Sequence, residues 1–310
     1  MSLRGAAAGS IPPQTGKLAV VTGAAGGLGY EIAMALAQGC ADVILAGRND
    51  ARGRAAAGKI RSLAPRALIR FEKLDLADLS SIRAFAARVS ANGRPIDLLI
   101  NNAGVMAPPQ RQLTADGFEL QIGTNYLGHF ALTGLLLPQL RLGRHPRVVQ
   151  VSSRFHRCGN IYFDDLNAER AYKPWAAYTQ SKLAALLFAG ELQLRSDRLG
   201  WRLLSSAAHP GFARTNLFAN GRGRRSVSTL VRTILGTVFS QSAADGARST
   251  LFAAASPDVR RGGFYGPCGL FEFAGPPAAA HVSRKAQDRK VAAKLWQVSE
   301  ELTGVQWPQN

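Results

Sequence analysis

Short apolar runs rich in Val, Ile and Leu alternate with longer stretches of helical periodicity along most of the 310 residues. Runs such as 18–23 (LAVVTG) and 97–104 (DLLINNAG) have the length of strands and end at turn-forming residues. Strand-helix alternation of this kind is typical of parallel sheets with helices packed on both faces. Because crossovers between parallel strands are right-handed, we expect an α/β fold with one doubly wound sheet.

The expected elements follow the chain without an interrupting linker, so we expect one domain over 16–310. A small-residue, Pro-containing segment at 1–15 precedes it and is expected to be a flexible tail. The expected strands, about seven, are 18–23, 42–47, 68–75, 97–104, 147–153, 201–211 and 262–267. The expected helices are 28–39, 50–63, 80–93, 175–198 and most of 114–140.

Composition excludes several other classes of protein. The net charge is +18, but the 38 basic residues are spread along the chain and no aromatic residues interleave with the few clusters, so no nucleic acid is expected as a partner. Three Cys and five His show no metal-ligand spacing, so no metal site is expected. We find no secretory signal and no run near the ~18 apolar residues of a membrane span. A cytoplasmic protein with at most weak peripheral membrane contact is therefore expected.

The first expected strand runs into the sequence TGAAGGLG. Gly23, Gly27 and Gly29 lie between a strand and a helix, where a tight turn and close backbone approach favour residues without Cβ. The following helix N-terminus would present N–H groups to a pyrophosphate. This arrangement is typical of dinucleotide binding in Rossmann folds, although a structural turn would also need glycines.

The second expected strand ends in Gly47-Arg48. A carboxylate at this point would hold the ribose 2′-hydroxyl of NAD, whereas a guanidinium can pair with the 2′-phosphate of NADP. Arg48 therefore favours NADP(H) over NAD(H).

Tyr178 and Lys182 stand four residues apart in AAYTQSKLA, within the expected helix 175–198, and so share one helix face. Alone, such a pair is as typical of a solvated surface as of a catalytic site.

The glycine motif TGAAGGLG is followed along the chain by Asp75-Leu76, NNAG (101–104), Asn125, Ser153, Tyr178-x-x-x-Lys182, and HPG (209–211) with Thr215. In order and spacing these motifs resemble the short-chain dehydrogenase/reductase family over 17 to about 270. The sequences TNYLGHFALTGLLLP, FDDLN, AYTQSKLA and LWQVSEELTGV resemble more narrowly its retinol dehydrogenase and WW-domain-oxidoreductase-like branch.

The resemblance implies a catalytic set of Asn125, Ser153, Tyr178 and Lys182. Tyr178 would exchange a proton with the substrate oxygen, and Lys182 with the oxidised nicotinamide would favour its phenolate. Ser153 would hydrogen-bond the substrate oxygen, with Ser152 as a rival for that role. Asn125 would hold a water for proton relay to Lys182.

The resemblance also implies the contacts of the cofactor. Asp75 and Leu76 would meet the adenine, Asn102 to Gly104 the adenosine ribose, and Lys182 the nicotinamide ribose. Pro210 and Gly211 would turn beside the nicotinamide. The full expected cofactor set is Gly23, Ala25, Gly27, Leu28, Gly29, Arg48, Asp75, Leu76, Asn102, Ala103, Gly104, Tyr178, Lys182, Pro210, Gly211 and Thr215.

The expected function is an NADP(H)-dependent oxidoreductase that acts on a small lipophilic ketone, aldehyde or secondary alcohol. Its substrate flap is expected over 212–240, where LVRTILGTVF is apolar. A non-catalytic NADPH sensor or scaffold is the alternative. Long helices at 114–140 and 175–198 that are apolar on more than one face suggest a homodimer, as in family dimers.

Overall fold

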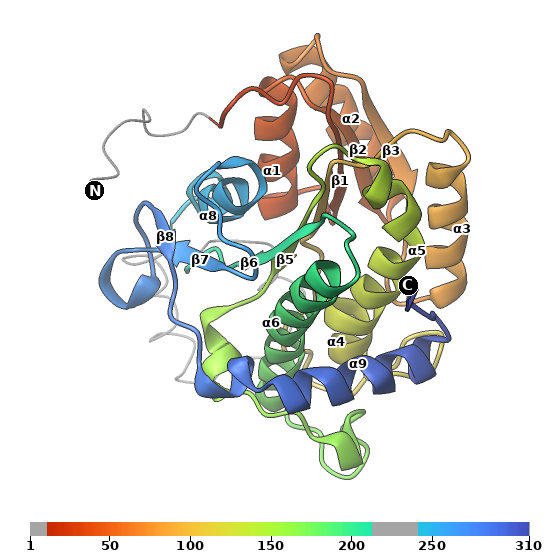
Figure 1. The fold of residues 1–310 in the computed structure, drawn as a ribbon, viewed down its shortest axis with the longest axis vertical. Coiled ribbons are helices and arrows are strands. Elements are labelled where there is room, and N and C mark those ends of the chain that lie inside the picture. The colour runs from red at the N-terminus through yellow and green to blue at the C-terminus, as the bar shows by residue number, and fades with distance from the viewer. Residues whose placement is uncertain (1–10, 213–240, 310) are drawn as a thin grey trace.

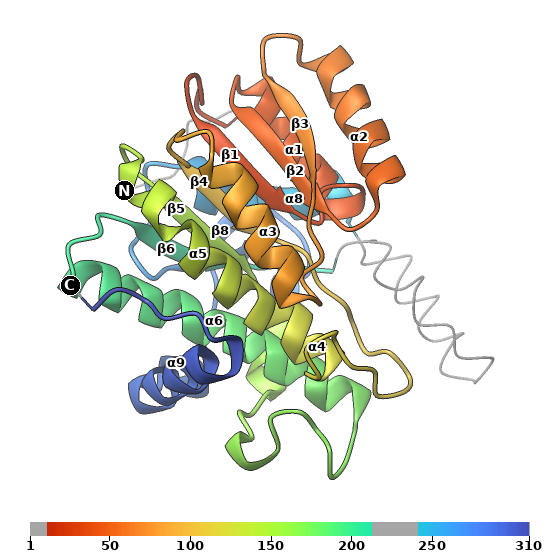
Figure 2. The ribbon, with the colours of Figure 1, turned by 90° about the vertical axis from the view of Figure 1, so that its right-hand side faces the viewer.

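Seven parallel strands and one antiparallel edge strand form a single sheet in the order β3-β2-β1-β4-β5-β6-β7-β8 (Figures 1 and 2). The computed structural model describes residues 11–212 and 241–309. The strands are β1 (Leu18–Thr22), β2 (Asp42–Gly47), β3 (Ile69–Lys73), β4 (Leu98–Asn101), β5 (Arg147–Val151), β6 (Leu204–Ala208), β7 (Phe264–Pro267) and β8 (Pro277–Ala279). The expected doubly wound α/β fold is confirmed, and β8 is a short addition that no alternation signalled.

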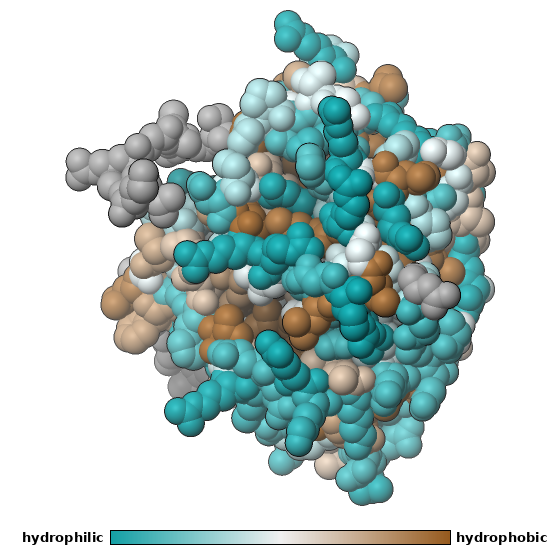
Figure 3. Space-filling view, in the orientation of Figure 1, coloured by the Kyte–Doolittle hydropathy of each residue, from teal (hydrophilic) through white to brown (hydrophobic). Residues whose placement is uncertain are grey.

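Helices cover both faces of the sheet, as strand-helix alternation predicts. One apolar core packs α1 (Gly27–Gln38), α2 (Asp50–Leu63) and α8 (Ala243–Ala255) on one face. The other core packs α3 (Leu79–Ser90), α5 (Gly128–Leu142) and α6 (Pro174–Arg198) on the opposite face. The surface in the view of Figure 3 is mainly hydrophilic, with apolar residues gathered near its middle. Within the described ranges, no helix combines the length and apolarity needed to cross a membrane.

The expected helix at 114–140 is interrupted in the structure. A turn closed by the bond from Thr114 N–H to the Phe118 carbonyl precedes α4 (Leu120–Ile122). A π-helical turn, η1 (Gly123–Leu127), then leads into α5. Single π-helical turns inside helices are rare and are often found at functional sites, and this one carries Asn125.

The expected N-terminal tail and the expected substrate flap lie only partly within the described residues. Of the expected tail, residues 11–15 lie against α1: Gln14 is buried and its N–H bonds the Gly39 carbonyl at 2.7 Å. The rest of the tail, and almost all of the expected flap at 212–240, lie outside the described residues.

The C-terminal helix α9 (Arg289–Thr303) packs across α5 and α6 (Figure 2). Trp296 and Trp307 lie with ring centroids 4.6 Å apart and both contact Phe130 of α5 and Phe188 of α6. Gly134 allows this approach, because a Cβ there would meet the Trp307 ring at 2.9 Å. The apolar surface that suggested a homodimer is thus largely buried inside one chain, and the homodimer stays a prediction.

Replacing Trp307 with Ala should lower the free energy of unfolding by about 3–5 kcal/mol, because the ring fills the space between α5, α6 and α9. Urea denaturation measures this change. Leu302→Ala, in the last turn of α9, is the control: Leu302 is exposed, so its loss should cost less than about 1 kcal/mol. Equal effects of the two substitutions would contradict the role given to Trp307.

Candidate active site

The carboxyl ends of six neighbouring parallel strands place the sequence-predicted residues along one edge of the sheet. The order of strands reverses between β1 and β4, and in doubly wound sheets ligands bind in the crevice outside this switch point. Gly23 follows β1, Arg48 follows β2, Asp75 comes just after β3, Asn102 follows β4, Ser153 comes just after β5 and Pro210 just after β6. Thr215 lies outside the described residues.

The turn between β1 and α1 requires its glycines. Gly23 has φ +69° and Gly27 φ +56°, in the left-handed region that favours glycine. At Gly29, a Cβ would lie 2.5 Å from both the Gly23 carbonyl oxygen and Asn102 Nδ2. Among the residues that the structure describes, no side chain caps the N-terminus of α1. The N–H groups of its first turn, which follows Ala25 and includes Leu28, can therefore bind an anion.

Two guanidinium groups flank this turn. Arg48 is exposed at the end of β2, and the Arg52 guanidinium lies beside Gly26, where a Cβ would be 3.6 Å from Nη2. Neither forms an ion pair with any residue that the structure describes, and the sequence outside those residues contains no Asp or Glu. Arg54, by contrast, pairs with Asp50 at 2.6 Å. Sequence reasoning missed Arg52; its position in the first turn after Arg48 was the available signal.

The residues after β3 and β4 that were expected to contact the adenosine also make contacts within the protein. Asp75 accepts the Ala77 N–H with Oδ1 at 2.9 Å, and Leu76 is buried beside it. Asn102 donates its side-chain amide to the Thr22 carbonyl at 2.7 Å. Its side chain therefore braces the glycine turn.

His129 joins that turn to Asn125, a connection that the sequence did not reveal. Its Nδ1 lies 3.1 Å from the Asn125 carbonyl, and because a carbonyl only accepts, Nδ1 carries the proton. Nε2 then accepts from the Thr22 hydroxyl at 2.9 Å, while Thr22 Oγ1 accepts the N–H groups of Asn102 and Ala103. Burial lowers the pKa of His129 to about 4, so the ring is neutral.

Asn125 and Lys182 meet at the end of β4. The Asn125 side chain exchanges two hydrogen bonds with the backbone of Val105, at 2.7 and 2.9 Å, and donates to Ser181 Oγ. At Gly104, a Cβ would lie 3.0 Å from Asn125 Oδ1 and 3.5 Å from Lys182 Nζ. Glycine at position 104 therefore leaves room for the Asn125 and Lys182 side chains beside the backbone.

The two serines after β5 have different surroundings. Ser152 is buried and donates to the Lys182 carbonyl at 2.7 Å, which is a structural contact. Ser153 is half-buried, and its hydroxyl lies close enough to the Tyr178 phenol to lower the pKa of that phenol. The structure thus brings Ser153, and not Ser152, together with the phenol.

Burial dominates the electrostatics of Tyr178 and Lys182. Burial raises the pKa of Tyr178 to about 12, against the smaller lowering effect of its bond to Ser153. Burial lowers the pKa of Lys182 to about 8. Lys182 Nζ donates to the Val151 carbonyl at 3.0 Å and lies 5.8 Å from the centroid of the Tyr178 ring. Lys182 alone therefore does not hold Tyr178 as the phenolate, and the expected joint effect of Lys182 and the oxidised nicotinamide stays a prediction.

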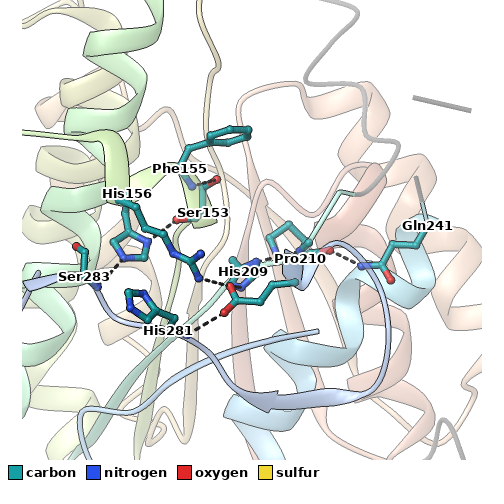
Figure 4. A network of polar contacts seen from close by, with 11 residues as sticks. Ser153, Phe155, His156, His209, Pro210, Gln241, His281 and Ser283 are labelled. Carbon is teal, nitrogen blue, oxygen red and sulfur yellow. Dashed lines mark hydrogen bonds and ion pairs between the residues drawn. The ribbon is translucent and has the colours of Figure 1, made fainter. Parts of the chain in front are cut away.

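The turn after β6 lies at the same edge of the sheet, next to the end of β5. Gly211 has φ +67° and donates its N–H to His209 Nδ1 at 3.2 Å, while Gln241 donates to the Pro210 carbonyl (Figure 4). The Trp175 ring, half exposed, contacts Tyr178 and Phe155 with centroids 5.8 Å apart in each case. An apolar surface thus adjoins the two hydroxyls.

These features fit a nicotinamide dinucleotide. The uncapped helix and the glycine turn suit a pyrophosphate, the two unpaired guanidiniums suit a further phosphate, and the buried Tyr-Ser-Lys cluster lies next to the turn at Pro210. Such a cofactor supplies or accepts a hydride when bound.

Comparison with known proteins agrees with this geometry. The family model for short chain dehydrogenases matches residues 17–225. Over 298 residues the chain is 40% identical to a polyprenol dehydrogenase of Mus musculus, covering 95% of this chain and 86% of that protein. It is 40% identical over 294 residues to retinol dehydrogenase 12 of Homo sapiens, covering 94% and 88%.

Solved structures are similar as well. An uncharacterized protein from Mycobacterium Paratuberculosis matches with a TM-score of 0.80 and 43% identity, over 96% of this chain and 97% of that one. A short chain dehydrogenase from Escherichia coli CFT073, complexed with NADPH, matches with a TM-score of 0.59 and 25% identity, over 79% and 92%. The chain belongs to the short-chain dehydrogenase/reductase family, and is an oxidoreductase of its retinol dehydrogenase-like branch.

Proposed function

We propose that this protein is an NADP(H)-dependent oxidoreductase that interconverts a lipophilic ketone or aldehyde and the corresponding alcohol, with Tyr178 as the general acid and base. The observation that carries the proposal is the proximity of the buried Tyr178 to Ser153 and to Lys182, one helical turn away, at the edge of the sheet that also holds the glycine turn.

The raised pKa of Tyr178 suits proton donation in the reductive direction. A phenol with a pKa of about 12 keeps its proton at neutral pH and can give it to a carbonyl oxygen as negative charge develops there. Ser153 is placed to donate a second hydrogen bond to the same oxygen. In the oxidative direction Tyr178 must lose its proton, so the positive charges of Lys182 and of the bound oxidised cofactor have to offset the effect of burial.

Two observations support a lipophilic substrate. Trp175 and Phe155 present an apolar surface beside Tyr178, and the similar proteins include dehydrogenases named for polyprenol and retinol, which are apolar alcohols. A screen of NADPH oxidation over lipophilic aldehydes and ketones tests the proposal. Binding of NADPH without turnover of any carbonyl or alcohol would instead favour a sensor.

Tyr178→Phe keeps the ring packing and removes only the hydroxyl. We expect turnover to fall by roughly 10²–10⁴-fold, the usual range for a positioned acid or base, with NADPH affinity nearly unchanged. Steady-state kinetics on the best substrate of the screen, with NADPH titrations, measure both. Ser152→Ala serves as a control beside Ser153→Ala: the Ser153 variant should lose activity, and the Ser152 variant should keep most of it. Near-native turnover of Tyr178→Phe would refute its catalytic role.

Arg48→Ala and Arg52→Ala should each weaken NADPH binding by about 1–3 kcal/mol, the range for hydrogen bonds to charged groups, and leave NADH binding unchanged. The matched control is Arg54→Ala on the same helix, because that guanidinium already pairs with Asp50. Dissociation constants for both cofactors decide the matter. Equal affinity of the native protein for NADPH and NADH would contradict the proposed preference.

Lys182→Met should stabilise the cofactor-free protein near pH 7 by up to about 3 kcal/mol, because a buried ammonium is replaced by an apolar chain. The pKa of Lys182 falls from 10.5 to about 8 on folding. Between these values the unfolded chain binds more protons, so native stability rises with pH and the advantage of the variant shrinks. Urea denaturation at pH 7 to 10 measures this. A constant difference over that range would show that Lys182 does not titrate as inferred.

A further inference from the structure

Glu272, at the end of the short 3₁₀ helix η5 (Leu270–Glu272), forms the centre of a polar network. Figure 4 shows the part of this network around His209 and His281. Glu272 Oε2 lies 2.6 Å from Arg157 Nη2 and 3.2 Å from His209 Nε2. Its Oε1 accepts the His281 N–H at 3.0 Å. The carboxylate thus contacts three separate segments.

Two of these contacts lead directly to the active site. Arg157 belongs to the 3₁₀ helix η2 (Arg154–Cys158), whose N-cap is Ser153. His209 immediately precedes Pro210 and Gly211. Since Nδ1 of His209 accepts the Gly211 N–H, the ring proton lies on Nε2 and faces Glu272. Glu272 therefore links the segment that begins at Ser153 to the turn after β6.

Phe273 reinforces both links. Its carbonyl accepts the Phe212 N–H at 2.9 Å, and a Cβ on Gly211 would lie 2.3 Å from the same oxygen. On the other side, the Arg154 guanidinium stacks over the Phe273 ring at 4.3 Å.

The backbone at Glu272 is held in an unfavourable conformation. Phe271 has φ +52° and Glu272 φ +57°, and left-handed residues other than glycine cost of order 1–3 kcal/mol each when strained. Such conformations persist where surrounding contacts over-determine them. Gly266 also leaves room for the network, because a Cβ there would overlap the His209 ring.

The charge of Glu272 is secured by its partners. Partial burial would raise its pKa, but His209, the His281 N–H and Arg157 together lower that pKa to about 2. At neutral pH the group is a carboxylate that accepts from Arg157 and from the His281 N–H, with His209 Nε2 3.2 Å away.

We propose that Glu272 is a positioning residue that sets the spacing between the Pro210–Gly211 turn and Ser153, and thereby aligns the nicotinamide half of the cofactor with Ser153 and Tyr178. The inference rests on the proposed function, because it takes the turn after β6 as the neighbour of the nicotinamide. The proposal predicts that loss of the Glu272 carboxylate weakens binding of the nicotinamide half of the cofactor and leaves binding of the adenosine half unchanged.

Glu272→Gln keeps the size of the side chain and removes its charge. We expect NADPH affinity to fall about tenfold and turnover on the best carbonyl of the screen to fall by roughly 10- to 100-fold, because small misalignments are costly to hydride and proton transfer. Adenosine 2′,5′-bisphosphate lacks the nicotinamide half and binds through the glycine turn and Arg48. Its affinity should stay within about twofold of native. Calorimetry with both ligands and steady-state kinetics give the three values.

Glu191→Gln is the matched control. Glu191 pairs with Arg195 at 2.8 Å and is even less exposed than Glu272 (10% against 19%), but it lies on α6, where Arg195 stacks over the Trp296 ring. It should lower the melting temperature and leave both affinities and turnover native. Should Glu272→Gln fail to fold, Arg157→Gln removes one of the links from the opposite side and is judged by the same criteria, with Arg157→Lys expected to restore part of the loss.

The possible outcomes separate the two proposals. Native values for all three measurements in Glu272→Gln, or equal weakening of NADPH and adenosine 2′,5′-bisphosphate, would overturn the positioning role while the proposed function stands. Failure of the native protein to bind either ligand would overturn the proposed function, and the positioning role with it.

Discussion

Parallel pairing of β1 to β7 is the constraint on which the rest of the molecule depends. Because these strands run in one direction, their carboxyl ends meet at one edge of the sheet, and residues remote in sequence become neighbours there. Thr22 at the end of β1 bonds Asn102 after β4, and Val151 of β5 accepts Lys182 from α6. Contacts of this kind join the end of one strand to another element, so the grouping of the site residues follows from the topology.

The site holds its ionisable groups in surroundings that oppose charge. Tyr178 and Lys182 are both buried, and burial shifts their pKa values in opposite directions, toward the neutral forms. Hydrogen bonds to Ser153 and to the Val151 carbonyl offset part of this cost. In such surroundings an added charge strongly shifts the pKa values of Tyr178 and Lys182. Proton exchange with a substrate needs pKa values that can shift in this way.

The C-terminal part of the chain serves both the core and the site. Trp296 and Trp307 complete the apolar core over α5 and α6, and so occupy a surface that could otherwise have faced a second subunit. Glu272 and Phe273, a short distance before α9, contact the segments on either side of the crevice. The loop that holds Glu272 and Phe273 carries none of the family motifs, yet it contacts the segments that follow Ser153 and Pro210.

The sequence by itself determined the features that depend on local pattern. Alternating apolar runs predicted the doubly wound sheet, glycines marked the turn after β1, and the four-residue spacing placed Tyr178 and Lys182 on one face of α6. Long-range packing decided the rest. Only the structure placed Arg52 beside the glycine turn, joined His129 to Asn125 and brought Glu272 to His209. Helical and strand periodicity is a property of neighbouring residues, whereas contacts between distant segments depend on how whole elements pack, which no local pattern encodes.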